Sequence, residues 1–112
     1  MHETPMSNFL YFHERTGTNA NALFKSTLFE GSQLLVGLNC LEPGQTQKTH
    51  VHSEQDKFYF VLEGKGEFVV GQETQEASVG CVVWAAAGIA HGVTNAGKQP
   101  LVLLVGIAPP PR

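Results

Sequence analysis

Short apolar runs alternate with turn signals along most of this chain. The runs are rich in Val, Leu, Phe and Tyr, and clusters of Gly, Pro, Asn or Asp separate them about every ten residues. No stretch shows the period of a long amphipathic helix, and no internal repeat or low-complexity segment is present. This pattern predicts an all-β protein built as an antiparallel sandwich or barrel. The predicted strands cover residues 9–12, 23–30, 34–41, 46–52, 57–62, 67–70, 77–79, 81–86 and 101–108.

Two of these runs are apolar on both faces. In residues 57–62, alternation places Lys57, Tyr59 and Val61 on one side, while large apolar side chains occupy the other side as well. The run 101–108 is also apolar in both phases. Strands of this kind are buried on both faces. In a domain this small, only the N-terminal segment or a second subunit could cover the outer face, and we therefore predict a homodimer.

Length and composition limit the architecture and the partners. The 112 residues are 42% hydrophobic and 15% charged, which suits a single domain over residues 1–112 with a core of its own. Within it we distinguish an N-terminal arm (1–22), a centre that holds the motifs (44–95) and a short tail (109–112). The net charge is −3 and the seven basic residues are scattered, so we expect no nucleic-acid partner.

The sequence carries no signal for a membrane or for disulfide bonds. No apolar run is long enough for a membrane span, and polar side chains interrupt residues 1–15. Cys40 and Cys81 do not form a C-x-x-C pair. We therefore expect a cytoplasmic protein with two reduced thiols and no membrane partner.

The tripeptide His50-Val51-His52 is the strongest chemical signal in the chain. In an extended strand, residues i and i+2 point to the same side, so His50 and His52 can share one cation. Imidazole nitrogens suit transition metals such as Zn, Ni, Cu and Fe. Two ligands leave such a site incomplete, and the third has to come from elsewhere in the chain.

The chain resembles the cupin superfamily in two motifs. The first family motif, G-x5-H-x-H-x3,4-E-x6-G, is similar to the run from Gly44 through His50 and His52 to Gly64. The second, G-x5-P-x-G-x2-H-x3-N, resembles the series Gly80, Ala86 (in place of Pro), Gly88, His91 and Asn95. The resemblance implies a small single-domain protein folded as a double-stranded β-helix, or jelly-roll barrel. It also implies that His91 is the third metal ligand beside His50 and His52.

The first motif lacks its glutamate. Counting back from Gly64 places Lys57 at that position, and counting forward from His52 places Asp56 there. A lysine ammonium about 6 Å from a dication costs roughly 5 kcal/mol at an effective dielectric of 20. A charged Lys57 therefore has to point away, pair with a carboxylate, lose its proton or replace the metal. We expect a three-histidine site with Lys57 directed elsewhere, and Asp56 as a candidate fourth ligand if a bulge turns it inward.

Two functions are compatible with these residues. The first is a metal-dependent oxidoreductase, dioxygenase-like, in which Fe, Ni, Zn, Cu or Mn acts on a small organic substrate, and an isomerase-type reaction fits as well. Lys57 and Tyr59 are the candidate catalytic residues. The alternative is a non-catalytic module that binds a small molecule, with a carboxylate or phosphate anchored near Lys57. Trp84 is expected in the core or at an interface.

Overall fold

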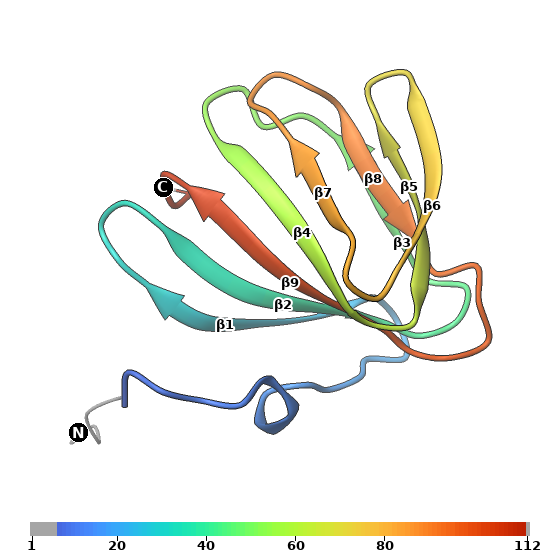
Figure 1. Ribbon diagram of the computed structural model, residues 1–112, viewed down its shortest axis with the longest axis horizontal. Coiled ribbons are helices and arrows are strands. Elements are labelled where there is room, and N and C mark those ends of the chain that lie inside the picture. The colour runs from blue at the N-terminus through green and yellow to red at the C-terminus, as the bar shows by residue number, and fades with distance from the viewer. Residues whose placement is uncertain (1–6, 112) are drawn as a thin grey trace.

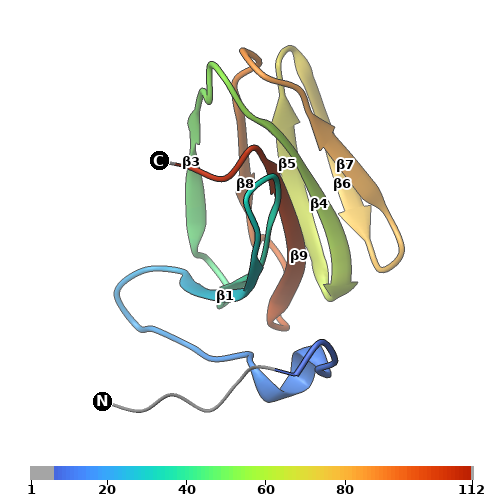
Figure 2. The ribbon, with the colours of Figure 1, turned by 90° about the vertical axis from the view of Figure 1, so that its left-hand side faces the viewer.

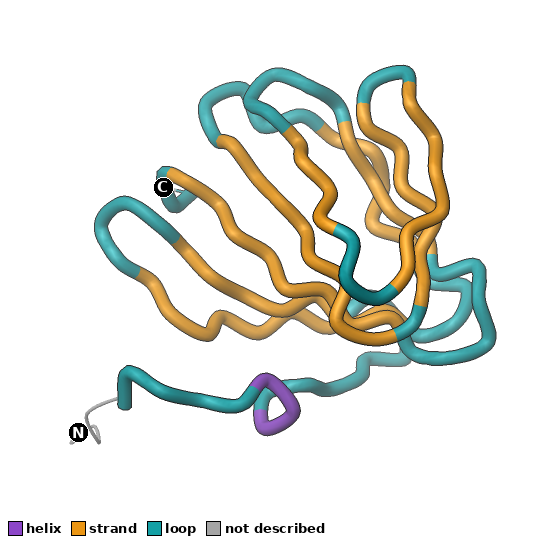
Figure 3. The backbone as a smooth tube through the Cα atoms, viewed as in Figure 1, coloured by secondary structure: helices purple, strands orange, loops and turns teal. Residues whose placement is uncertain are grey.

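The computed structural model describes residues 7–111 of the chain. Strands make up most of it, as Figures 1 and 3 show, and the predicted all-β fold is confirmed. No helix within the described residues is long and apolar enough to cross a membrane. In chain order the elements are the 3₁₀ helix η1 (Phe12–Glu14) and the strands β1 (Phe24–Glu30), β2 (Leu35–Leu41), β3 (Thr46–His50), β4 (Asp56–Glu63), β5 (Lys65–Val70), β6 (Glu73–Ser78), β7 (Val82–Ala85), β8 (His91–Thr94) and β9 (Leu101–Ala108).

Strand pairing arranges the chain in two antiparallel sheets. One sheet has the order β1-β2-β9-β4-β7 and the other has the order β3-β8-β5-β6. Because the chain passes repeatedly from one sheet to the other, the result is a double-stranded β-helix, or jelly-roll barrel. β9 lies in the middle of the larger sheet, hydrogen-bonded to β2 on one side and to β4 on the other (Figure 1).

The main core fills the space between the sheets. Alternate residues of each strand point into it, as the two-residue period of a strand requires. Tyr59 and Val61 of β4 and Leu103 of β9 are fully buried there, and Phe68 of β5 packs against them from the other sheet. Lys57 belongs to the same phase of β4 as Tyr59 and Val61, so the packing of these two residues also fixes the direction of the lysine.

The outer face of the five-stranded sheet is apolar too, as the runs with two apolar faces predicted. Leu10 and Phe12 of the N-terminal segment pack on this face, and the segment runs beneath the barrel (Figure 2). The strand predicted over residues 9–12 is absent, because these residues lie on a sheet face, where no free strand edge is available for pairing. The buried residues of this outer cluster are Leu28, Leu38, Cys40 and Val102.

Part of the same outer face stays uncovered within one chain. Trp84 and Val82 of β7 stand opposite Phe58 and Phe60 of β4 in the sheet register, and they are 56% and 62% exposed. Trp84 was expected either in the core or at an interface. Its exposure rules out the core and leaves the interface as a prediction.

Candidate metal centre

His50 turns toward the barrel interior because β3 contains a bulge. The register against β8 pairs Gln47 with Val93 and His50 with His91, so β3 has one more residue than β8 between these pairs. Simple alternation from the buried Gln47 would have turned His50 outward. The extra residue shifts the phase of the strand, and His50 and His91 become cross-strand neighbours.

Gly92 of β8 makes room for this bulge. A β-carbon at Gly92 would lie 2.9 Å from the backbone oxygen of Gln47 and 2.9 Å from both the backbone nitrogen and Oγ1 of Thr49. Two of these three contacts are with backbone, so a side chain here could be accommodated only by moving β3. Gly92 therefore positions His50 without being a ligand. The only signal in the sequence is a glycine inside a strand, which often marks close backbone approach.

The structure brings the three motif histidines together. One ring nitrogen from each of His50, His52 and His91 lies within 4.8 Å of the other two, and the ring centroids are 4.5, 4.7 and 5.4 Å apart. His50 ends β3, His52 follows in the next loop, and His91 begins β8. A metal bound about 2.1 Å from each nitrogen needs these nitrogens roughly 3–3.5 Å apart.

Backbone hydrogen bonds determine which nitrogen is free in two of the rings. Nδ1 of His50 donates to the backbone oxygen of Lys48 at 2.7 Å, and Nδ1 of His91 donates to that of Ile89 at 3.0 Å. A carbonyl oxygen can only accept, so both rings carry their proton on Nδ1 and have a lone pair at Nε2.

Nε2 of His91 is a buried atom without a partner among residues 7–111. Leaving a buried acceptor unpaired costs free energy. A metal ion at the meeting point of the three rings would use this lone pair, and the hydrogen bond at Nδ1 is the support that metal-binding histidines commonly have. The donor set and the orphaned nitrogen thus fit a divalent transition metal.

The surroundings of His52 and His91 favour the neutral form of both rings. Burial lowers the pKa of His52, and nearby cationic groups, with His50 and Lys57 first among them, lower it further. Burial is also the main cause of a lowered pKa at His91. Because neutral imidazole is the form that binds metal, both rings remain competent ligands at lower pH than a free histidine would.

Asp56 lies outside the histidine group, which corrects the idea of a fourth ligand at this position. Neighbouring residues of a strand point to opposite faces, and Lys57 takes the inner face of β4. Oδ1 of Asp56 instead accepts a hydrogen bond from the backbone nitrogen of Ala87 at 2.9 Å, which ties the start of β4 to the turn after β7. A bulge in β4 would be needed to turn Asp56 inward, but the bulge beside the histidines lies in β3.

Lys57 points into the barrel, with its Nζ over the ring of Tyr59, and the expectation that it is directed away from the metal stays a prediction. The residue is 3% exposed, and Nζ lies 4.7 Å from the centre of the Tyr59 ring. Among the described residues no carboxylate forms an ion pair with it. Burial, helped by the charge of Lys25, lowers the pKa of Lys57 to about 8. Of the alternatives considered from the sequence, loss of the proton is the one that these surroundings favour.

Tyr59 is buried next to the histidines and is already hydrogen-bonded. Its hydroxyl donates to Oε1 of Gln47 at 2.6 Å, and its ring centroid is 6.2 Å from that of His91. Burial raises the pKa of the phenol, which therefore stays protonated. Tyr59 thus anchors β3 through Gln47. Gln47 was not predicted from the sequence, because a single glutamine in a polar run looks like a surface residue.

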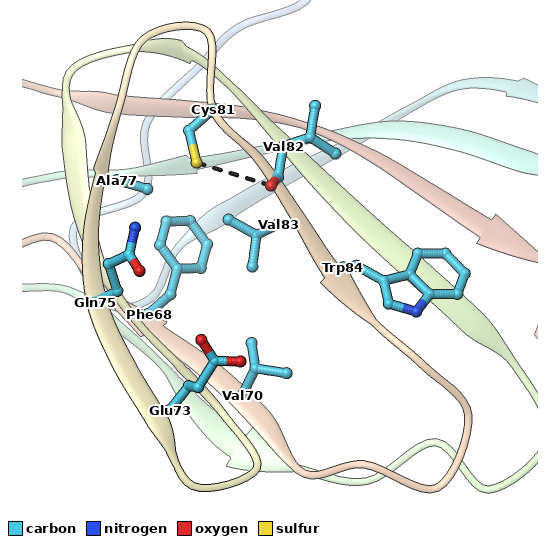
Figure 4. A pocket seen from close by; sticks show the side chains of 9 residues that line it. All are labelled: Phe68, Val70, Glu73, Gln75, Ala77, Cys81, Val82, Val83 and Trp84. Carbon is cyan, nitrogen blue, oxygen red and sulfur yellow. Dashed lines mark hydrogen bonds between the residues drawn. The ribbon is translucent and has the colours of Figure 1, made fainter.

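Two hollows adjoin this part of the barrel. One, of about 410 Å³, borders His52 and is lined mainly by the loop 51–55 with Pro109 and Pro110. The other, of about 300 Å³, lies between β6 and β7, with Phe68 at its floor and Trp84 at its rim (Figure 4). Of the two hollows, only the first is lined by one of the three histidines.

Comparisons with known proteins agree with this architecture. An uncharacterized protein of Streptomyces coelicolor is 39% identical over 75 residues, which cover 67% of this chain and 70% of that protein. A Thermus thermophilus protein of known crystal structure is 36% identical and superposes with a TM-score of 0.90, covering 94% of this chain and 100% of that chain. A Klebsiella pneumoniae protein described as having a double-stranded beta-helix domain is 24% identical, with a TM-score of 0.87 and coverage of 93% and 91%. This last likeness shows a shared fold.

Residues 37–107 match the cupin domain as a family. The matched span runs from within β2 to within β9 and includes His50, His52 and His91. It covers more than half of the chain, and the match agrees with both motifs and with the observed barrel. The chain therefore belongs to the cupin family.

Proposed function

We propose that this cupin binds a divalent transition metal through His50, His52 and His91 and acts with it on a small organic molecule. Fe, Ni, Zn, Cu and Mn are the candidate ions. The observation that carries the proposal is Nε2 of His91, which is buried without a partner and lies in one group with nitrogens of the other two rings.

The proposed activity is that of a dioxygenase-like oxidoreductase, with an isomerase-type reaction as the second class. The bound ion would supply Lewis-acid or redox chemistry at coordination positions that three nitrogen ligands leave open. The chain contributes neutral imidazoles, a bulge that holds His50 in place, and Tyr59 as an anchor for β3. Lys57, whose pKa is lowered to about 8, can hold or release a proton at Nζ near neutral pH.

Metal content tests the proposal. Protein purified without an affinity tag and offered each candidate ion is expected to retain a stoichiometric amount by elemental analysis. The double variant His50→Ala, His91→Ala should lose it, because a single imidazole remains in the group. The matched control is His13→Ala, since His13 is an exposed histidine outside the group that bonds to Glu63. Equal retention by the double variant would contradict the proposal.

A second candidate function is favoured by Lys57. The ammonium is buried without a carboxylate partner in the described chain, and Lys25 adds a second positive charge close enough to lower its pKa. A non-catalytic module that anchors the carboxylate or phosphate of a small ligand at Lys57 would use this charge. Purified protein with an empty metal site and a small acid bound near Lys57 would favour this module over the enzyme.

We also propose that the protein forms a homodimer through the uncovered part of the outer face, around Val82 and Trp84. Apolar side chains of β4 and β7 continue the covered part of the same face. Light scattering coupled to size-exclusion chromatography is expected to give twice the mass of one chain. Trp84→Asp should give a monomer, whereas Ile89→Asp, at a position 41% exposed in the β7–β8 loop, should not. A monomeric parent protein would contradict the proposal.

For the location of the protein we propose the cytoplasm. Both cysteines, Cys40 and Cys81, are free, as thiols are in a reducing compartment. Burial raises the pKa of the Cys40 thiol, so this cysteine serves as a small apolar core residue.

A further inference from the structure

We propose that Lys57 binds carbon dioxide as a carbamate on Nζ, and that this carbamate supplies the anionic ligand missing from the three-histidine centre. The inference rests on the proposed metal centre. His50, His52 and His91 offer nitrogen only, and no Asp or Glu among residues 7–111 joins their group. Carbamylation would place a carboxylate-like group beside them without any change in the sequence.

The position of Lys57 suits this modification. The residue is 3% exposed on the inner face of β4, and Nζ lies over the ring of Tyr59, 4.7 Å from its centre. The same ring is 6.2 Å from that of His91, so Lys57 and His91 are both neighbours of Tyr59. Nζ has no hydrogen-bond partner among the described residues, so its lone pair is free to react.

The charged groups around Lys57 favour an anion over an ammonium. Lys25 of β1 acts on it with a like charge, and the positive charge of Lys57 in turn lowers the pKa of His52 and of His91. The face of the Tyr59 ring, in contrast, attracts the ammonium. The nearest acid along the chain, Asp56, points outward and is held by the backbone of Ala87. A carbamate would turn each of these repulsions into an attraction.

The chemistry needs only the neutral amine and carbon dioxide. The lone pair of Nζ attacks the carbon of CO₂ and forms a C–N bond, and the electron pair of one C=O bond moves onto oxygen. One proton leaves the nitrogen for solvent, and the product is a carbamate with one negative charge. The lowered pKa of Lys57, about 8, leaves part of the amine unprotonated at neutral pH. No oxidant or reductant takes part, and loss of the carbamate is the reverse reaction.

The carbamate would also link CO₂ to metal binding. An ammonium at Lys57 repels a dication, whereas a carbamate oxygen is a ligand for it. Metal binding and carbamate formation therefore stabilise each other, as linkage requires. In the metal-free protein the same side chain remains the ammonium that the second candidate function uses.

The test measures the modification and the metal separately. Protein at pH 8 is equilibrated with Zn²⁺ in CO₂-free buffer or with ¹³C-bicarbonate, and a carbamate is detected by its ¹³C resonance. We expect one labelled carbamate resonance, and Zn²⁺ binding by calorimetry at least about tenfold tighter with bicarbonate than without it. Acetate at the same concentration should not replace bicarbonate.

Two variants and a control make the result specific. Lys57→Gln should lose the resonance and bind Zn²⁺ equally with and without bicarbonate. Lys57→Glu, which carries a permanent carboxylate, should bind tightly in both buffers. Lys65→Gln removes an exposed lysine paired with Glu76 and should behave like the parent protein.

The outcomes separate this inference from the proposed function. Tight Zn²⁺ binding that ignores bicarbonate, or a resonance that survives in Lys57→Gln, overturns the carbamate and leaves the metal centre standing. A bicarbonate effect that survives in Lys57→Gln also overturns it, because bicarbonate would then be a direct ligand. Absence of Zn²⁺ binding in every buffer, in Lys57→Glu as well, overturns the metal centre and the carbamate together.

Discussion

Gly92→Ala is expected to weaken metal binding about 10- to 100-fold, as loss of outer support for a ligand does, while all three histidines remain in place. The added methyl group would meet the backbone of Gln47 and Thr49 at 2.9 Å, so β3 has to move away from β8. The bulge that turns His50 toward His91 lies in that stretch. Such overpacking also destabilises a fold by about 1–3 kcal/mol. Calorimetric titration with Zn²⁺ and urea unfolding measure the two effects.

The control for Gly92 is another glycine without close neighbours. Gly31→Ala introduces the same methyl group in the β1–β2 turn, where the nearest atom is the backbone oxygen of Leu34 at 3.7 Å. Metal affinity should not change in this variant. If Gly92→Ala binds metal as tightly as the parent protein, the bulge does not depend on the space that Gly92 leaves, and the assignment of Gly92 as a positioning residue is wrong.

Lys57→Met is expected to stabilise the metal-free protein by about 2 kcal/mol at pH 7. Burial lowers the pKa of Lys57 from 10.5 to about 8, and at 1.36 kcal/mol per pH unit this corresponds to a penalty of about 3 kcal/mol for the buried ammonium. The ammonium also gains about 1 kcal/mol from the ring of Tyr59, which methionine loses. Methionine fills a similar volume with its flexible chain. The burial penalty is the larger effect, so the variant gains stability.

The pH dependence checks the cause of this gain. The pKa of Lys57 is lower in the folded than in the unfolded chain, so between about pH 8 and 10.5 the unfolded chain binds the additional proton. The stability of the parent protein therefore rises with pH across this window. Below about pH 8, Lys57 is protonated in both the folded and the unfolded chain, and the full cost of burying the ammonium applies. The advantage of Lys57→Met should shrink above pH 8 and vanish by about pH 10.5.

Urea unfolding at pH 7 and pH 10 measures both values. Lys98→Met, at an exposed lysine, should change the free energy of unfolding by less than about 0.5 kcal/mol at either pH. A less stable Lys57→Met at pH 7 would mean that the ammonium has a stabilising partner inside the barrel, and the view of Lys57 as an unpaired buried charge would be wrong.

The fold could be predicted because its local signals agree with one another. Alternation in residues 57–62 placed Lys57 and Tyr59 on one face, and turn residues marked most strand ends. β6 extends further than the predicted 77–79, since Glu73–Ser78 is a polar edge strand in which Ala77 alone is buried. Polar edge strands lack the apolar alternation from which strands are recognised.

The candidate site was only partly predictable, for two physical reasons. The motifs bring His50, His52 and His91 into one site, but the phase of β3 depends on its register with β8, and no local pattern around Gln47 reveals a bulge. The direction of Lys57 was inferred from its repulsion of a metal. In the structure, backbone alternation in β4 determines the direction of Lys57. Lys57 and Tyr59 lie on the same face of β4, so Lys57 could turn outward only if Tyr59 also left the core.

The central place of β9 has a consequence for the synthesis of this protein. β2 and β4 each form a full ladder with β9, so both remain as unpaired edges while the ribosome has yet to deliver Leu101–Ala108. Pairings of such wide sequence separation form slowly, and exposed strand edges invite association with other chains. Until β9 pairs with them, these two edges are open to association with other chains. The larger sheet is complete only when β9 pairs with β2 on one side and with β4 on the other.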